Sequence, residues 1–413
     1  MLRLSEFKTY HLVILGLVVI PFYELMIRIL PYASVIVTDS RAGKLTLAIW
    51  IALAAGLLGL YRGEIRKVIL FPCLILFFNL ISIRFAPKIF MAVNDVDSSG
   101  FWMWRPSYYM LCFFLYFAAV SNLIVTRDNI NSILKTMFIC GSVMAGYCIL
   151  QSLGFDQFYY VKPFEKIGTV TKPEVIATLG NSTLVSSFIA MVTPIGLYLN
   201  ETKRNIWLWR ALLIVCVTGV LVTLSEASIL SLIIGGVVFF SMKSRKMMIC
   251  SVLIAAMIIL AAVCLKINTQ AGTERSRVIL QDNGRINNWK MIFNHIRTEK
   301  YEEQAPFALT GAGPGSYPYL FPSKNKSMFK EAHNEYLECF FIYGLFGFLL
   351  FIGMKIEILM KAIRKIKTSM TALPMLCCFI VISVNAFFSF PYHLGAHVFY
   401  TATIAGLICN DHS

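Results

Sequence analysis

The chain has 413 residues, of which 58% are hydrophobic, and its formal net charge is +15. Its mean hydropathy of +0.70 excludes an ordinary soluble protein, because soluble chains contain roughly 45–50% apolar residues. The basic residues are scattered among apolar runs and no nucleic-acid motif accompanies them. We therefore attribute the charge to membrane topology and contact with anionic lipids, and we expect no nucleic-acid partner.

Apolar runs long enough to cross a bilayer as helices recur along the whole chain. Backbone groups must be satisfied inside lipid, so these runs predict an all-α polytopic membrane protein. We expect about twelve transmembrane helices, at 10–31, 44–61, 68–85, 107–126, 132–153, 183–200, 206–222, 226–241, 247–266, 335–354, 371–389 and 394–409. Helices one to nine then occupy 1–266, one large loop occupies 267–334, and the last three helices occupy 335–413.

The placement of lysine and arginine in short loops predicts the orientation. Basic residues follow the second, sixth, eighth and tenth expected spans, and others precede the first. These residues are Arg3, Lys8, Arg62, Arg66, Lys67, Lys203, Arg204, Lys243, Arg245, Lys246, Lys355, Lys361, Arg364, Lys365 and Lys367. All of them fall on one side, which we expect to be cytoplasmic together with both termini.

Three segments on the opposite side are long: 86–106, 154–182 and 267–334. A loop as long as the third is usually functional in a compact fold. Within it, 284–296 (GRINNWKMIFNHI) has the spacing of a short amphipathic helix. The compartment outside the cytoplasmic membrane has no ATP, so chemistry there requires a substrate that arrives already activated.

His333 and Asn334 stand where the third loop enters an apolar run. One interpretation is that Asn334 caps the helix and His333 is an interfacial polar residue. The alternative starts from helical spacing, which puts His333 on the same face as Gly344 and Gly347. Small residues admit a neighbouring helix, so this stripe predicts that His333 faces the bundle interior as a functional group. Histidine is the side chain best suited to proton transfer near neutral pH.

Basic residues near the start of the amphipathic segment are candidates for binding phosphate oxygens. Arg285 has a planar fork of donors suited to phosphate, and Arg277 and Lys290 are neighbouring cations. By charge alone Arg285 ranks only slightly above them, and each of the three is also compatible with a solvated loop position.

A polar segment, TLSEAS at 223–228, divides two short apolar runs and predicts a tight helical hairpin. Thr223 and Glu226 match the capping box, in which threonine and glutamate satisfy helix-start amides. The alternative is that Glu226 is a carboxylate that lines a polar cavity.

Further polar residues mark the outer ends of other spans. Asn181 belongs to a Gly-Asn turn in TLGNST at 178–183, before the sixth span. His393 and His397 are four residues apart around the start of the last span. This spacing suits a metal, but no third ligand is evident, and we favour polar groups that line an outer cavity.

The order of these motifs resembles the O-antigen ligase and O-antigen polymerase superfamily. The motifs are GR…W at 284–289, GAGPGSY at 311–317, and His333-Asn334 followed after nine residues by the GLFG of 344–347. TLGNST, TLSEAS and FFSFPYHL (387–394) are similar to further family segments, so the resemblance covers about residues 175 to 400. It implies a membrane glycosyltransferase of the GT-C type, without a cofactor, nucleotide sugar or metal.

The resemblance also implies the substrates and the roles of residues. Such enzymes move a glycan from undecaprenyl diphosphate to the lipid A core (ligases) or to a second lipid-linked glycan (polymerases), on the periplasmic side of the inner membrane. It implies catalytic roles for His333, as general base on the acceptor hydroxyl or as the group that orients this hydroxyl, and for Arg285 as a diphosphate ligand. We assign substrate binding to Asn334, Glu226, Asn181, Arg277, Lys290 and His393.

The chain departs from the family at one position and leaves other functions open. Glu226 stands where the family has an arginine thought to contact the donor diphosphate, and like charges would repel. Either another cation compensates or the donor is bound in a different way. Lys172, Arg105 and Arg285 are candidates for the cation, and motif position supports Arg285 alone. We favour the ligase, with the polymerase as the alternative within the enzyme class. A flippase for lipid-linked glycans or a transporter is the alternative of another class.

Overall fold

The computed structural model describes residues 2–29, 40–60, 74, 99–123, 126–156, 175–202, 205–253, 256, 289–290, 292–294, 309, 311–314 and 332–410. Within these ranges the regular elements are all helices. They are α1 (Leu2–Ile29), α2 (Ser40–Leu60), α5 (Ser99–Ser121), α6 (Arg127–Ser152), α7 (Ser182–Thr202), α8 (Ile206–Val222), α9 (Glu226–Ser241), α15 (Glu335–Ile366), α16 (Ala372–Asn385) and α17 (Gly395–Cys409), with the short 3₁₀ helix η3 at Pro391–His393.

These helices confirm the all-α class and lie on ten of the predicted spans. The bounds of α8 and α9 agree with the prediction, and α15 continues well past its predicted end at 354. Among the described residues, α6, the stretch Ser182–Glu201 of α7, and α15 are long and apolar enough to cross a membrane. The predicted spans 68–85 and 247–266 lie largely outside the described residues, and the count of twelve stays a prediction.

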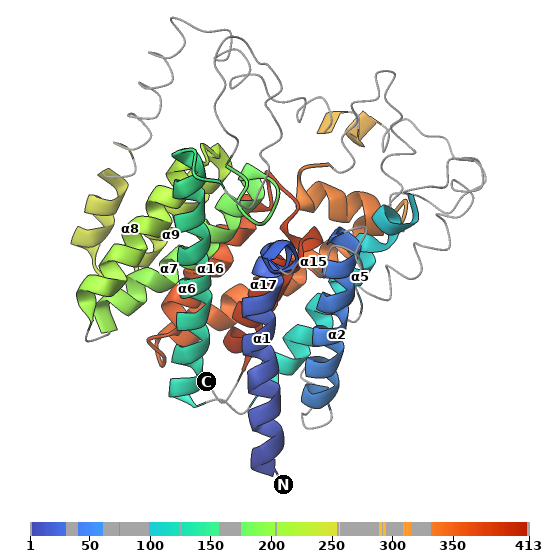
Figure 1. The fold of residues 1–413 in the computed structure, drawn as a ribbon, viewed down its shortest axis with the longest axis horizontal. Helices are drawn as coiled ribbons and strands as arrows, with labels where there is room; N and C mark the ends of the chain where they lie inside the picture. Colours follow the sequence, from blue (N-terminus) through green and yellow to red (C-terminus); the bar gives the residue numbers. More distant parts are fainter. Residues whose placement is uncertain are drawn as a thin grey trace, which may run out of the picture.

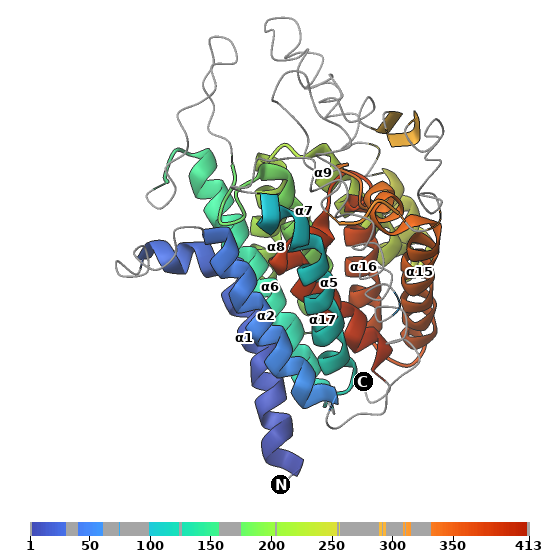
Figure 2. The ribbon, with the colours of Figure 1, turned by 90° about the vertical axis from the view of Figure 1, so that its right-hand side faces the viewer.

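The helices form one bundle whose two chain ends lie at the same end (Figures 1 and 2). Helix α17 runs through the interior and packs against α5, α1 and α16. Helices α7, α8 and α9 pack beside α16 and α6. Small residues permit the closest approaches: a Cβ on Gly406 would meet Val120, and one on Gly219 would meet Ala145.

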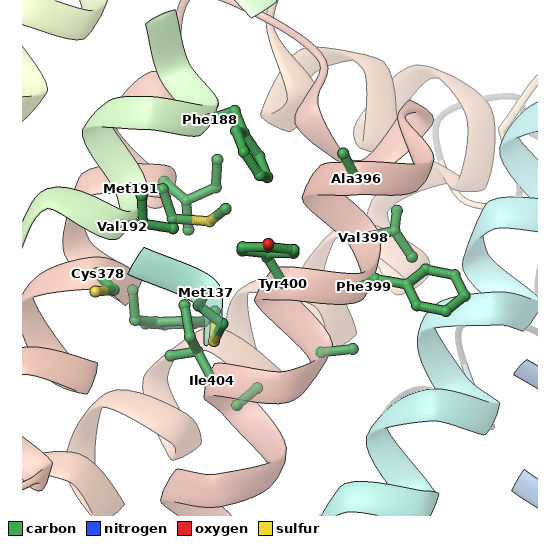
Figure 3. Close-up of a cluster of buried hydrophobic side chains, with 14 of the residues drawn as sticks. Met137, Phe188, Met191, Val192, Cys378, Ala396, Val398, Phe399, Tyr400 and Ile404 are labelled. Atoms are coloured by element: carbon green, nitrogen blue, oxygen red, sulfur yellow. The ribbon is translucent and has the colours of Figure 1, made fainter. Parts of the chain in front are cut away.

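Buried aromatic and sulfur-containing side chains fill the space between α7, α16 and α17 (Figure 3). The ring of Tyr400 lies 4.6 Å from that of Phe188, and its hydroxyl donates to the carbonyl of Leu17 in α1. A buried tyrosine needs such a partner for its polar atom. The hydrogen bond therefore ties the N-terminal helix to the last helix of the chain.

Helices α15 and α17 run in the same direction, which places the candidate site at one end of the bundle. Lys365, near the end of α15, donates to the carbonyls of Leu407 and Asn410 at the end of α17. The start of α15 contacts the start of α17, because the backbone N–H of Tyr392 donates to Glu335. His333 thus lies at the end opposite to the C-terminal end of α17.

Helix α15 is broken at Gly344, whose φ of 68° and ψ of −170° are not helical. Next to the break, the carbonyls of Phe341 and Ile342 accept from another segment of the chain. Their donors are the N–H groups of Ala312 and Gly313, at 2.8 and 3.0 Å. The predicted turn in 309–322 is therefore confirmed at 311–314, where it docks onto the broken helix.

The break makes the stripe argument for His333 wrong. His333 lies before the first residue of α15, and its φ of 52° is not helical. Helical spacing counted from His333 through Gly344 to Gly347 therefore does not describe one face. The sequence hid the break because Gly344 sits within an uninterrupted apolar run.

Candidate functional site

Asn334 is the N-cap of α15, as predicted. Its side-chain oxygen accepts from the N–H groups of Tyr336 and Leu337 at 3.0 and 3.1 Å. The cap satisfies amides that have no partner within the helix. Asn334 is buried, whereas the adjacent His333 is partly exposed. His333 thus stands at the boundary between the bundle and its surroundings.

The segment between α16 and α17 lies against His333. The ring of Phe390 meets the His333 ring edge to face, at a centroid distance of 5.1 Å. Phe390 also contacts His393, whose ring centroid is 6.0 Å away. The structure therefore brings His393 next to the His333 region, although 59 residues in between make this contact invisible to local sequence patterns.

A buried acidic residue lies beside His393. The Glu335 carboxylate lies 3.6 Å from Nε2 of His393 and accepts from the backbone N–H of Tyr392 at 3.2 Å. Both side chains are only 5% exposed. Buried polar and charged groups persist in proteins when they are paired, and Glu335 and His393 are such a buried pair. The prediction that His393 lines an outer cavity is not tested, but its burial limits direct contact with a large glycan.

Lys355 lies in the bundle beside this pair, where the orientation prediction had put it in a cytoplasmic loop. Its ammonium donates to the hydroxyls of Tyr392 and Ser383, both at 3.2 Å. Four aromatic rings surround it, with the closest centroid at 4.9 Å. The placement of Lys355 in a loop was wrong because α15 extends to Ile366 and carries Lys355 in its interior. Burial raises the pKa of Tyr392 well above its usual value, so its hydroxyl stays protonated beside the lysine.

The TLSEAS segment forms the predicted tight hairpin between α8 and α9, but the capping box is wrong. Thr223 ends α8 and donates to the carbonyl of Val220, while Ser225 stands before the first residue of α9. Glu226 begins α9 and is exposed. Its exposure at a helix start is compatible with the alternative of a carboxylate beside a polar surface, which stays a prediction.

Buried hydroxyls join the start of α9 to α7 and α16. Ser228 contacts Ser186 at 2.7 Å, accepts from Ser225 at 3.1 Å and donates to Asn385 at 3.2 Å. Asn385 in turn donates to Ser231. Because each of these polar groups has a partner within the bundle, the network is explained as a link between the three helices.

Two further predicted residues have local structural roles. Asn181 is exposed and its side chain accepts from the N–H of Thr183 at 2.9 Å, as the predicted Gly-Asn turn before α7 requires. His397 is buried, and its Nε2 contacts the Ser187 hydroxyl at 2.7 Å. Among the described residues, no group of histidine, cysteine, aspartate and glutamate side chains is arranged to hold a metal.

Lys290 is exposed, and Arg277 and Arg285 lie outside the described residues, as do Lys172 and the side chain of Arg105. Trp289, the neighbour of Lys290, donates from its indole nitrogen to the carbonyl of Ala332 at 2.9 Å. This bond ties the GR…W motif to the residue before His333. It was not predicted, because 43 residues separate the two groups.

Glu338 is a second residue that the sequence did not assign. Its carboxylate accepts from the N–H of Ala332 at 2.6 Å, and its side chain is almost completely buried. The available signal was a carboxylate inside an apolar run, which is costly to bury unless it is hydrogen-bonded. Such a residue is a candidate for a defined structural or functional role.

A comparison with curated proteins found no match. Residues 211–352 match the family described as O-antigen ligase. The matched region begins in α8 and ends in α15, so it includes the hairpin, the long loop, His333 and the break at Gly344. These are features on which the motif resemblance rests, so this region of the chain is similar to the O-antigen ligase family, in agreement with the resemblance to the O-antigen ligase and polymerase superfamily.

Proposed function

We propose that the protein transfers a glycan from undecaprenyl diphosphate to the lipid A core, as an O-antigen ligase does, at the periplasmic face of the bacterial inner membrane. The observation that carries the proposal is the position of His333 within the family-matched region. It is a partly exposed histidine at the outer end of a helical bundle, between a buried alanine and a buried helix cap.

In the proposed reaction the acceptor hydroxyl attacks the anomeric carbon of the donor. The bond between this carbon and the phosphate oxygen breaks, undecaprenyl diphosphate leaves, and His333 takes the proton of the hydroxyl. The anomeric centre passes through an oxocarbenium-like state. No nucleotide sugar and no metal take part, as the family resemblance implies.

Cations stabilise the leaving diphosphate in this scheme. Arg285 is the main ligand, because it stands at the family's motif position and its guanidinium matches phosphate geometry. Lys290, which is exposed, and Arg277 add positive charge. Asn334 and Asn181 offer amides at helix starts, and Glu226 lies at the start of a third helix.

The acceptor decides between two activities of this superfamily. A ligase uses the lipid A core, and a polymerase uses a second lipid-linked glycan. We favour the ligase and expect the loop 267–334 to cover the site and to select the acceptor. The match to the O-antigen ligase family supports an activity of this superfamily, which includes both ligases and polymerases.

Transfer by the purified protein tests the proposal. The full-length chain is placed in lipid nanodiscs with lipid-linked glycan extracted from cells that lack it, and with lipid A core or more donor as acceptor. A ligase forms glycan-bearing lipid A core, and a polymerase forms a ladder of longer lipid-linked glycans. Absence of a new glycosidic bond with both acceptors, together with movement of the donor across vesicles, would identify a flippase.

A further inference from the structure

The peptide groups on both sides of Ala332 are held by side chains from different parts of the chain. The Ala332 N–H donates to the carboxylate of Glu338 at 2.6 Å, and the Ala332 carbonyl accepts from the indole of Trp289 at 2.9 Å. Ala332 is completely buried and Glu338 is 3% exposed. Loss of a hydrogen-bond partner by a buried backbone group destabilises the folded protein. Both contacts therefore restrain the backbone at Ala332.

These contacts determine how the chain enters His333. The Ala332 carbonyl and the His333 N–H belong to one planar peptide group. The hydrogen bond from Trp289 therefore restrains the orientation of the peptide plane that precedes His333. On the other side, Asn334 is fixed as the N-cap of α15. His333 itself has a φ of 52°, a conformation that few residues with a side chain adopt. Such a backbone persists when its surroundings over-determine it, and such residues cluster at functional sites.

We propose that Trp289 and Glu338 are positioning residues, which fix the peptide groups on the two sides of Ala332 and thereby orient the His333 imidazole toward the acceptor hydroxyl. This inference rests on the proposed function, because it takes His333 as the general base. Neither side chain needs to touch the substrate. Their effect is to keep the reacting group within the narrow range of positions in which proton transfer is efficient.

The contact through Trp289 also connects the two halves of the proposed site. Trp289 is four residues after Arg285 in the GR…W motif, and its indole reaches the residue before His333. One hydrogen bond therefore relates the segment of the proposed diphosphate ligand to the backbone of the proposed base. The indole N–H of Trp289 is a donor without an acceptor, which suits the carbonyl of Ala332.

Replacement of Trp289 by phenylalanine tests the first contact, since it removes the N–H donor and keeps an aromatic ring. Trp289→Phe is expected to lower kcat for glycan transfer by about tenfold to hundredfold, with the KM for the donor within about twofold of wild type. The matched control is Trp207→Phe, the same change at an exposed residue of α8, for which kcat stays at the wild-type value. A wild-type kcat for Trp289→Phe, or a loss confined to KM, would overturn the proposal.

Two substitutions of Glu338 test the second contact independently. Glu338→Gln keeps an oxygen that accepts from the Ala332 N–H, and it is expected to retain most of kcat. Glu338→Met keeps the length of the side chain without an acceptor and is expected to fall like Trp289→Phe. Glu357→Met, on the outer side of α15, controls for loss of a carboxylate from the same helix. Equal activity of the Gln and Met variants would contradict the role of the hydrogen bond.

The outcomes separate this inference from the proposed function. If His333→Ala abolishes transfer while Trp289→Phe and Glu338→Met keep the wild-type kcat, the base is supported and the positioning role is wrong. If His333→Ala keeps full transfer, the proposed function itself fails. Thermal unfolding of each purified variant is measured first. Should Trp289→Phe not fold, the comparison of Glu338→Gln with Glu338→Met decides.

Discussion

His333 is one of three non-glycine residues with a positive φ among the described residues. It has a left-handed backbone, partial exposure, and buried neighbours on both sides. A left-handed conformation costs a residue with a side chain about 1–2 kcal/mol. Asn334, Glu338 and Trp289 offset this cost by holding the adjacent backbone. The cost and its compensation are consistent with a residue whose orientation matters for function.

Arg285 is the second residue on which the proposed reaction depends. Arg285→Ala is expected to abolish glycan transfer while the amount of protein in the membrane is unchanged, because the leaving diphosphate loses its main cation. Arg285→Lys keeps the charge but loses the planar fork, and is expected to restore transfer only in part. Glycan assembly in a deletion strain, followed on gels, measures both variants. Full complementation by Arg285→Ala would remove Arg285 from the mechanism.

The Asn334 cap gives a prediction about stability. Asn334→Ala is expected to lower the free energy of unfolding by about 1 kcal/mol, because the N–H groups of Tyr336 and Leu337 lose their acceptor. Asn334→Asp keeps the acceptor and is expected to preserve the stability. Thermal unfolding of the purified variants measures the difference. Equal midpoints for the alanine and aspartate variants would show that the cap contributes little.

At the scale of elements, the break in α15 is the feature on which the docking of the long loop depends. Gly344 and Gly311 both have positive φ, and a Cβ on either would meet the backbone of the other segment. The extended, positive-φ conformation of Gly344 is essentially restricted to glycine. The two glycines thus allow the segment 311–314 to donate to the carbonyls next to the break.

Gly344→Ala is therefore expected to destabilise the protein by about 3 kcal/mol or more, from backbone strain together with the clash against the segment 309–311. Gly236→Ala in α9 is the control, since nothing lies within 4 Å of its added Cβ. That variant is expected to be neutral or about 0.5–1 kcal/mol more stable, because alanine favours a helix. Similar unfolding midpoints for both variants would show that position 344 tolerates a side chain and that the break does not depend on glycine.

Sequence patterns predicted the elements better than their contacts. The hairpin of α8 and α9 was predicted residue for residue, because two apolar runs end at a short polar segment. The break at Gly344 was missed because an uninterrupted apolar run gives no sign of a change in backbone conformation. The interior position of Lys355 was missed because the sequence alone does not distinguish a lysine near the end of a helix from one in the following loop. The contacts of Trp289 with Ala332 and of Glu335 with His393 join distant segments, which no local period reveals.

At the scale of the whole molecule, the proposal requires a fixed orientation in the membrane. The candidate site and the two chain ends lie at opposite ends of the bundle (Figure 1). The basic loops predict that the chain ends are cytoplasmic, and we therefore expect His333 to face the periplasm.

Fusion reporters test this orientation. Alkaline phosphatase inserted within 267–334 is expected to be active, because the enzyme requires the oxidising periplasm. The same reporter inserted after Ser244, just beyond α9, is expected to be inactive, and green fluorescent protein at the C-terminus is expected to fluoresce. The reverse pattern would place His333 on the cytoplasmic side and would contradict a transfer reaction in the periplasm.

The most direct test of the central claim compares two histidines in the same transfer assay. His333→Ala is expected to reduce glycan transfer by the purified protein by about a hundredfold or more, because the acceptor loses its general base. His11→Ala, the same change at an exposed residue of α1, is expected to leave transfer unchanged. Formation of the new glycosidic bond by His333→Ala at the rate of His11→Ala would contradict the account.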